Sequence, residues 1–445
     1  MMFNLDEILK ASGAELIKNA SECDDYSIST DTRTIQAGEL YLPLKGASFD
    51  GEKFLQNAVD AGAGGCFITG DEYPENAQVV LKVENTLEAY MRLANFLRTK
   101  INPKVVAITG SSGKTTTKEI VYSVVSEKFK SHKTFSNHNN EVGFCQTVLS
   151  MPENCEVLII EMGMRGFGEI ELLSRYAQPD YAIITNAGSA HIGRLGSLDN
   201  IAKAKAEIAL HLKDNGTFIS QNNERIKKFV AFAGDKVYYS VEDVEILERR
   251  PSYSTFIYQG KEYELNVEGD YNVENSLSAI TLGYKLGMTY DEIRRGLAAY
   301  KPIEKRWEVE EVHGYKIIND SYNANPESMK ASVSTFVQLY ENPVVVLGNM
   351  GELGEAEVEL HRTVGDYLAN ISPKNVKYLT VGHLAREIGI PLEDAGFFVK
   401  NFENNDEVSK YLLANVYAGN TIFLKASRSM KFEQIIENLK GEVKI

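Results

Sequence analysis

The stretch Val105-Val106-Ala107-Ile108-Thr109-Gly110-Ser111-Ser112-Gly113-Lys114-Thr115-Thr116 decides the fold of this chain. Its apolar start predicts a buried strand, its glycines predict a turn, and a helix is expected from Thr115. Strand, glycine-rich loop and helix in this order bring backbone N–H groups and a lysine to phosphate oxygens. We therefore expect a phosphate-binding loop made of Gly110, Ser111, Ser112, Gly113, Lys114, Thr115 and Thr116.

This loop differs from the common GxxxxGK[ST] pattern, because Ile108 stands where that pattern has its first glycine. Lys114 can still neutralise phosphate charge, and the Thr115 hydroxyl can bind Mg²⁺. The alternative is a Gly/Ser turn beside a surface lysine. A surface turn does not account for the buried strand before the loop and the helix after it, whereas a phosphate loop requires both.

Apolar runs alternate with helical segments along most of the chain, for example at Val157–Ile160 and Tyr181–Ile184. Such alternation predicts an α/β fold with parallel sheets. At 445 residues the chain exceeds the size of one hydrophobic core. We expect a small α/β N-terminal domain over residues 1–97, a central parallel-sheet ATPase domain over 98–301, and a C-terminal Rossmann-like domain over 302–445.

Composition narrows the class of protein. The net charge of −15 argues against a general nucleic-acid surface, although not against binding one nucleotide. The four cysteines are far apart, which favours buried thiols in a reducing compartment over a zinc knuckle or disulfides. Asp6 and Glu7 interrupt the apolar N-terminus, and no apolar run approaches the ~20 residues of a membrane span. We expect a cytoplasmic protein without membrane insertion.

Polar residues follow two of the predicted central strands. Glu161 ends one apolar run, and Asn186 to His191 follow another, so both could share a sheet edge with the phosphate loop. If each residue is considered alone, the simplest interpretation of Glu161 is an ordinary carboxylate at a strand end. The simplest interpretation of His191 is a histidine that packs in a loop. Their shared position favours metal binding, since Mg²⁺ prefers oxygen ligands. From spacing alone, Lys203 and Lys205 are two solvated lysines of a helix.

Together these residues resemble the Mur ligase family. The central segments are Gly110–Thr116, Glu161, Asn186–His191 and Ala204–Glu207. Three further segments resemble the branch that adds D-Ala-D-Ala to UDP-MurNAc-tripeptide: Ser136–Gly143, Asp320–Pro326, and Leu347–Gly354 with His361 downstream. The likeness extends from about Asp31 to Arg428.

The resemblance implies an ATP-dependent peptide ligase of peptidoglycan precursor synthesis. It would act through an acyl phosphate and release ADP and phosphate. The cofactors would be ATP, two Mg²⁺ ions and a carbamylated Lys205, which reverses the interpretation of that lysine from spacing. Besides the loop, the resemblance implies that ATP is bound by Asn275, Arg306 and Asp320. The metal ligands it implies are Thr115, Glu161, His191 and Lys205. The catalytic residues it implies are Lys114, Lys205, His191 and Asn323.

The same resemblance implies sites for the other two substrates. Asp31-Thr32-Arg33 is similar to a D-S-R segment of the family, and Phe49-Asp50-Gly51 to its F-D-G partner. The residues implied for the UDP substrate are Asp31, Thr32, Arg33, Phe49, Asp50, Gly51, Asn137, Asn139 and Asn140; those for the dipeptide are Tyr322, Asn323 and Asn325. Tyr271 and Asn349 depart from the family pattern, where histidine and aspartate are usual. We expect a monomer.

Two alternatives remain open. One is a ligase of the same mechanism with another substrate, such as a folylpolyglutamate synthase or a Mur ligase that adds a single amino acid. The other is a phosphate-loop regulatory NTPase without ligase activity. No N-K-x-D motif for guanine recognition accompanies the loop.

Overall fold

The computed structural model describes residues 3–46, 49–303, 305–417 and 419–441. Contacts divide it into two compact units. Unit 1 comprises Met1–Ala107, Phe129–Met162 and Leu172–Pro179; unit 2 comprises Ile108–Lys128, Gly163–Glu171 and Asp180–Ile445.

Unit 1 contains a five-stranded sheet in the order β2-β7-β6-β5-β4. Its strands are β2 (Glu15–Asn19), β4 (Ile28–Ser29), β5 (Leu40–Tyr41), β6 (Gly65–Ile68) and β7 (Val79–Lys82). Only β2 runs antiparallel to its neighbour. Helix α2 (Leu55–Asp60) packs on this sheet, and α1 (Leu5–Ser12) contacts α3 (Thr86–Ile101). The apolar run over residues 40–44 predicts a short strand, but the strand observed there, β5, ends at Tyr41.

Strand β8 (Lys104–Thr109) passes from unit 1 into unit 2. It belongs to a six-stranded sheet with the order β13-β12-β11-β8-β10-β9. In unit 1, β9 (Ser131–Lys133) and β10 (Val157–Glu161) are parallel. In unit 2, β11 (Tyr181–Ile184), β12 (Thr217–Gln221) and β13 (Asp235–Tyr239) are parallel. Parallel pairing confirms the class predicted from strand–helix alternation.

A second six-stranded sheet lies in unit 2, with the order β17-β18-β22-β19-β20-β21. Its strands are β17 (Glu308–Val312), β18 (Tyr315–Asn319), β19 (Pro343–Gly348), β20 (Lys377–Val381), β21 (Phe398–Phe402) and β22 (Thr421–Lys425). All pairs are parallel except β17 with β18. This sheet confirms the expected second doubly wound unit.

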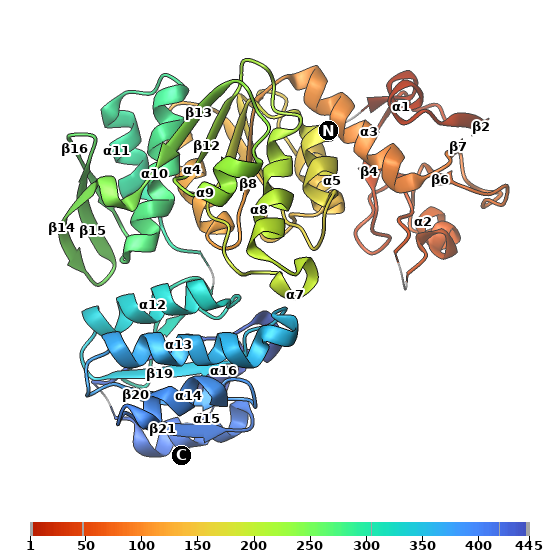
Figure 1. The fold of residues 1–445 in the computed structure, drawn as a ribbon. Helices are drawn as coiled ribbons and strands as arrows, with labels where there is room; N and C mark the ends of the chain where they lie inside the picture. The colour runs from red at the N-terminus through yellow and green to blue at the C-terminus, as the bar shows by residue number, and fades with distance from the viewer. Residues whose placement is uncertain (1–2, 47–48, 304, 418, 442–445) are drawn as a thin grey trace. The chain divides into compact units, whose positions relative to one another are not determined.

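Helices cover both faces of that sheet. Helix α12 (Pro326–Leu339) lies beside α13 (Glu357–Ile371), which contacts α14 (Arg386–Asp394) (Figure 1). Helices α15 (Asn405–Asn415) and α16 (Glu433–Gly441) pack together and share an apolar core with the strands. Burial on both faces explains the nearly continuous apolar runs of the strands.

An antiparallel sheet of unit 2 was not predicted from the sequence. It consists of β14 (Val244–Arg250), β15 (Tyr253–Tyr258) and β16 (Lys261–Leu265), and α10 (Asp270–Lys285) and α11 (Tyr290–Ala299) follow it. Strand β14 is mostly exposed and rich in charged residues, so it lacks the apolar run that marks a buried strand.

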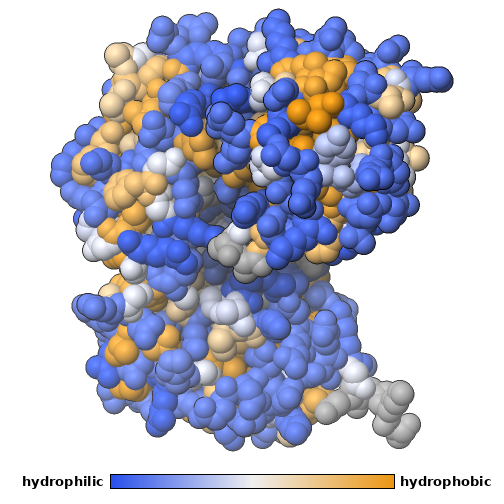
Figure 2. Space-filling model, turned by 90° about the vertical axis from the view of Figure 1, so that its right-hand side faces the viewer, coloured by the Kyte–Doolittle hydropathy of each residue, from blue (hydrophilic) through white to orange (hydrophobic). Residues whose placement is uncertain are grey.

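Two expectations about the surface can be compared with the structure. Three cysteines are buried as expected, but Cys23 is exposed. No helix in the described ranges is both long and apolar enough to cross a membrane. Hydrophilic residues cover most of the face in Figure 2, and hydrophobic residues there form separate patches.

Candidate functional site

The phosphate loop joins β8 to α4 (Lys114–Val125), as predicted. Its two glycines are required by close contacts. A Cβ on Gly110 would lie 1.8 Å from Oγ1 of Thr185. A Cβ on Gly113, whose φ is +77°, would lie 2.6 Å from Oδ1 of Asn275. Both positions therefore need glycine, and Asn275 lies directly against the loop.

Residues after β11 hold the loop in place. The N–H of Ser111 donates to the Asn186 carbonyl (3.1 Å), and the N–H of Ser112 donates to Oδ1 of Asn186 (3.0 Å). The Ser111 hydroxyl donates to the Gly188 carbonyl (2.9 Å), and the Thr185 hydroxyl donates to the Ser112 carbonyl (2.6 Å). The Asn186 segment thus supports the loop backbone, a role that the sequence analysis did not assign to it.

The basic residues at the loop come from two parts of unit 2. Lys114 lies across the loop, where its Nζ donates to the Gly110 carbonyl (2.8 Å). Nη2 of Arg306 donates to the Thr115 hydroxyl (3.0 Å), and its guanidinium lies 3.9 Å from the centre of the Tyr322 ring. Two cations beside backbone N–H groups suit a polyphosphate. The structure therefore brings Lys114, Thr115, Arg306 and Tyr322 together.

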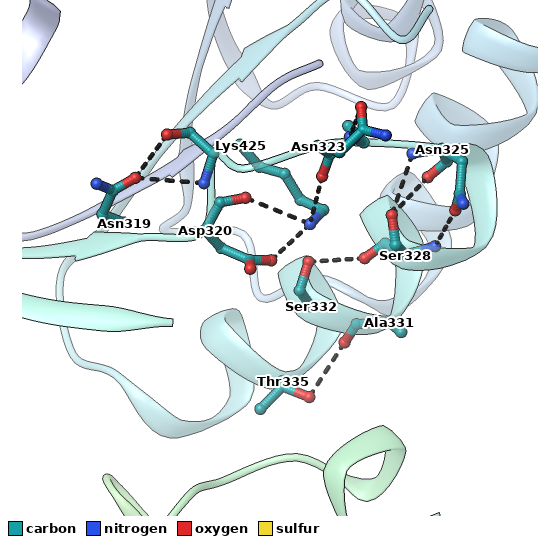
Figure 3. A network of polar contacts seen from close by, with 11 residues as sticks. Asn319, Asp320, Asn323, Asn325, Ser328, Ala331, Ser332, Thr335 and Lys425 are labelled. Atoms are coloured by element: carbon teal, nitrogen blue, oxygen red, sulfur yellow. Dashed lines mark hydrogen bonds and ion pairs between the residues drawn. The ribbon is translucent and has the colours of Figure 1, made fainter. Parts of the chain in front are cut away.

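An ion pair between buried Lys425 and half-buried Asp320 holds the neighbouring Asp320–Asn325 segment (Figure 3). Nζ of Lys425, at the end of β22, lies 2.5 Å from Oδ2 of Asp320. It also reaches the carbonyl oxygens of Asp320 (3.4 Å) and Asn323 (3.5 Å), as Figure 3 shows. Lys425 was not among the predicted site residues, although it ends an apolar run and Lys425-Ala426-Ser427-Arg428 is similar to a K-G-S-R segment of the family. Asp320 is engaged by Lys425.

The dipeptide candidates differ in exposure. Asn323 is exposed, whereas Asn325 is buried and caps α12 by accepting a hydrogen bond from the Ser328 N–H (2.8 Å). Nδ2 of Asn325 also reaches the Ser111 carbonyl at 3.5 Å. The segment therefore has one residue in contact with the phosphate loop and another that is accessible.

Lys205 lies on α8 (Leu198–Ala206) and is only 1% exposed. Burial, and next the charge of Lys114, holds the pKa of Lys205 well below its usual value. Lys203, on the same helix, is exposed. The interpretation of Lys205 as solvated was wrong, because packing of α8 buries one of these two lysines. A neutral amine is nucleophilic, and this is the state that reacts with CO₂.

His191 precedes the short helix α7 (Ile192–Leu195) and is paired with Glu352. Nδ1 of His191 lies 2.7 Å from Oε2 of Glu352. The Gly193 N–H donates to the Glu352 carbonyl (3.1 Å). The close contact with His191 is the main cause that lowers the pKa of Glu352. Glu352 was predicted only as a member of a segment that resembles the family, with no role of its own.

The candidates for the UDP substrate lie in unit 1. Asp31 accepts hydrogen bonds from Nε (2.9 Å) and Nη2 (2.6 Å) of Arg33, and these bonds lower the pKa of Asp31 to about 2. Burial, and then the charges of Asp31 and Asp50, raises the pKa of Tyr41 to about 12. The Tyr41 hydroxyl donates to the Gly51 carbonyl (3.1 Å). Tyr41 thus links the two predicted segments, although the sequence did not single it out.

The remaining residues of that set are arranged as follows. Phe49 is 53% exposed and stacks on Phe54, with 5.6 Å between ring centres. Thr32 is half-buried, and Asn137 is exposed. Asn140 caps α5 (Glu141–Leu149) by accepting from the Gly143 N–H (3.0 Å).

Asn139 and Glu161 meet inside unit 1. Nδ2 of Asn139 donates to Oε1 of Glu161 (3.0 Å), and the N–H of Glu161 donates to the Thr134 hydroxyl (3.0 Å). Glu161 is 2% exposed. The family resemblance implies different ligands for these two residues, a UDP-linked substrate for Asn139 and a metal for Glu161, yet their side chains are in direct contact.

No group of three or more His, Cys, Asp or Glu side chains converges on a common point within the described parts of the chain. Thr115 in unit 2 offers a hydroxyl oxygen and Glu161 in unit 1 a carboxylate, and each by itself is a suitable donor for Mg²⁺. Such an ion usually takes few protein ligands and several from phosphate and water. The donor types therefore fit Mg²⁺ held with a nucleotide.

Comparison with known families gives two matches. Residues 108–283 match the Mur ligase middle domain. Residues 305–428 match the Mur ligase glutamate ligase domain.

Individual relatives match over nearly the whole chain. The UDP-N-acetylmuramoyl-tripeptide–D-alanyl-D-alanine ligase of Bacillus subtilis (strain 168) is 37% identical, over 96% of this chain and 97% of that protein. The crystal structure of MurF from Acinetobacter baumannii superposes with a TM-score of 0.91 at 27% identity, covering 99% of both chains. The MurF ligase from Thermotoga maritima in complex with ADP gives a TM-score of 0.83 at 25% identity, covering 94% of this chain and 97% of that one.

Proposed function

Because the chain belongs to the Mur ligase family, we propose that it joins D-Ala-D-Ala to UDP-MurNAc-tripeptide in an ATP-dependent reaction. The product would be UDP-MurNAc-pentapeptide, a precursor of peptidoglycan. The relative from Bacillus subtilis carries the name of this activity and matches along nearly the full length of both chains.

One observation carries the proposal: the phosphate loop and the Asp320–Asn325 segment meet in one unit. Arg306 contacts Thr115, and Asn325 reaches Ser111. A nucleotide on the loop would therefore present its terminal phosphate toward residues that we assign to the dipeptide. Proximity of this kind lowers a barrier by about 7–11 kcal/mol when reactants are well oriented.

The reaction has two steps. A carboxylate oxygen of the tripeptide attacks the γ-phosphorus, the bond to the β–γ bridging oxygen breaks, and ADP leaves. The neutral amine of D-Ala-D-Ala then attacks the acyl carbon, phosphate leaves with its bridging oxygen, and the amine loses a proton. Lys114 and Arg306 would offset the repulsion between the carboxylate and the phosphate, because both carry positive charge at the loop.

Mg²⁺ would add further charge stabilisation at the same phosphates. Thr115, Glu161 and His191 are our candidates to hold two ions. We further propose that the neutral amine of Lys205 attacks CO₂ and loses a proton, which gives a carbamate anion that would support a metal. The burial of Lys205 and its lowered pKa support this assignment.

The other substrate assignments rest on unit 1. We propose that the Asp31–Arg33 and Phe49–Gly51 segments, together with Asn137, Asn139 and Asn140, bind the UDP-linked substrate. Tyr41 supports this grouping because its hydroxyl contacts Gly51 and because, after burial, the charges of both Asp31 and Asp50 raise its pKa. We also propose three domains, over residues 1–97, 98–301 and 302–445, that act as a monomer in the cytoplasm.

The test is a ligation assay with ATP, Mg²⁺, D-Ala-D-Ala and UDP-MurNAc-tripeptide carrying either meso-diaminopimelate or lysine. Mass spectrometry of the UDP product should show addition of the dipeptide to at least one tripeptide. A single amino acid in place of the dipeptide should give no product. If ATP is hydrolysed at full rate without either acceptor or UDP-peptide, the regulatory NTPase is the better explanation.

A further inference from the structure

The first turn of α12 contacts two loops at once. Asn325, its N-cap residue, reaches the Ser111 carbonyl at 3.5 Å. Two residues later, Glu327 accepts two hydrogen bonds from Ser189, one from its N–H (3.0 Å) and one from its hydroxyl (2.8 Å). The helix is therefore joined to the phosphate loop and to the segment after β11.

Glu327 also approaches the backbone beside Ser189. A Cβ placed on Gly188 would lie 2.9 Å from Cδ of Glu327, so glycine allows the carboxylate to sit there. The Gly188 carbonyl in turn accepts the hydrogen bond from the Ser111 hydroxyl (2.9 Å). A continuous set of contacts thus connects Glu327, through residues 188–189, to the phosphate loop.

The position of these contacts gives them a consequence for ligation. Our candidates for the dipeptide, Tyr322, Asn323 and Asn325, lie directly before α12. The placement of α12 therefore sets the distance between the dipeptide and the phosphate loop. Hydrogen bonds to a carboxylate are stronger than neutral ones, so Glu327 suits the task of fixing that distance.

We infer that Glu327 is a positioning residue for ligation, which acts by holding Ser189 and so keeps the dipeptide segment in register with the phosphate loop. This inference rests on the proposed ligase function. Glu327 itself touches neither the phosphates nor the acyl carbon. Its loss should affect turnover rather than nucleotide affinity, because the contacts of Asn186 and Thr185 with the loop would remain.

The experiment compares Glu327→Ala, Glu327→Gln, Ser189→Ala and the double variant Ser189→Ala/Glu327→Ala with the parent enzyme. Glu359→Ala, an exposed glutamate of α13, is the matched control. The measurements are kcat for ligation, KM for D-Ala-D-Ala, the dissociation constant of ADP and the thermal midpoint of unfolding.

Because solvent reaches Glu327, the effect should be moderate: kcat of Glu327→Ala should fall roughly 5- to 20-fold, while ADP affinity changes less than about twofold. Glu327→Gln keeps an acceptor for the Ser189 N–H and should recover most of kcat. The double variant should be no slower than Glu327→Ala, since both changes remove one interaction. Glu359→Ala should match the parent.

Several outcomes would overturn the inference: kcat of Glu327→Ala within about twofold of the parent, a double variant whose losses multiply, or a Gln variant as slow as the Ala variant. The Gln variant also separates positioning from misfolding if Glu327→Ala proves unstable. Failure of the parent enzyme to ligate would instead contradict the proposed function itself.

Discussion

His191 and Glu352 face each other across 2.7 Å, and each has a left-handed backbone, with φ of 68° and 63°. Such a conformation costs a non-glycine residue about 1–3 kcal/mol, so the surrounding contacts must hold it. One of these contacts is an approach of two glycines, Gly193 and Gly354. A Cβ on Gly193 would lie 2.5 Å from the Gly354 nitrogen.

We therefore predict that Gly193→Ala separates the His191 loop from the Glu352 loop. Ligation kcat should fall by about tenfold or more, because misplacement of about 1 Å can cost that much. Steady-state kinetics would measure the fall in kcat. Gly166→Ala is the control, since a Cβ on Gly166 meets open space. A Gly193→Ala enzyme as fast as the control would show that this approach does not matter for turnover.

Lys114→Ala should abolish ligation and leave the fold intact. Lys114 is the cation that the loop itself supplies to the phosphates. Loss of a group that stabilises charge in the transition state lowers kcat by roughly 100-fold or more. Product mass and the thermal midpoint of unfolding are the two measurements, and Lys236→Ala, an exposed lysine of β13, is the control. Substantial ATP-dependent ligation by Lys114→Ala would refute the role given to this residue.

Lys205→Ala should be nearly inactive, and added short carboxylates should restore part of its activity. The reason is that a small carboxylate can occupy the space of the carbamate and supply its negative charge. Ligation rates with and without acetate or formate would test this. Lys203→Ala, on the exposed side of the same helix, should need no rescue. Full activity of Lys205→Ala without additive, or no rescue at all, would count against the carbamate.

Glu274→Gln should stabilise the protein increasingly as pH rises. Burial raises the pKa of Glu274 above the ordinary value of 4.5, and the hydrogen bond from Gln221 offsets this only in part. Because the folded pKa is the higher one, the stabilising contribution of Glu274 is present below the unfolded pKa and is lost as pH rises through the folded pKa.

Urea unfolding of Glu274→Gln and the parent at about pH 4 and about pH 8 would measure the difference. From about pH 4 to about pH 8, the free energy of unfolding of Glu274→Gln should rise relative to that of the parent. Exposed Glu437→Gln, on α16, should show no such trend. A pH-independent difference for Glu274→Gln would contradict the account.

The sequence predicted those features that depend on local pattern. The phosphate loop follows from one strand, two glycines and a lysine within a dozen residues, and the parallel sheets follow from continuous apolar runs. The N-terminal strand predicted at 40–44 was too long, because the apolar residues after Tyr41 are buried without forming ladder pairs.

Features that depend on packing between distant segments were not predictable in this way. Lys205 resembled a solvated lysine because only the docking of α8 shows which of its lysines is buried. The Lys425–Asp320 pair joins residues 105 positions apart. The contacts of Glu327 with Ser189 and of Asn139 with Glu161 likewise need the tertiary structure.

The path of an oxygen atom tests the central claim most directly. UDP-MurNAc-tripeptide labelled with ¹⁸O in its terminal carboxylate would be ligated to D-Ala-D-Ala, and the released phosphate analysed by mass spectrometry. Our account predicts one ¹⁸O in each phosphate, because the carboxylate oxygen that attacks the γ-phosphorus leaves with it. Unlabelled phosphate, released while the pentapeptide product forms, would contradict the acyl phosphate.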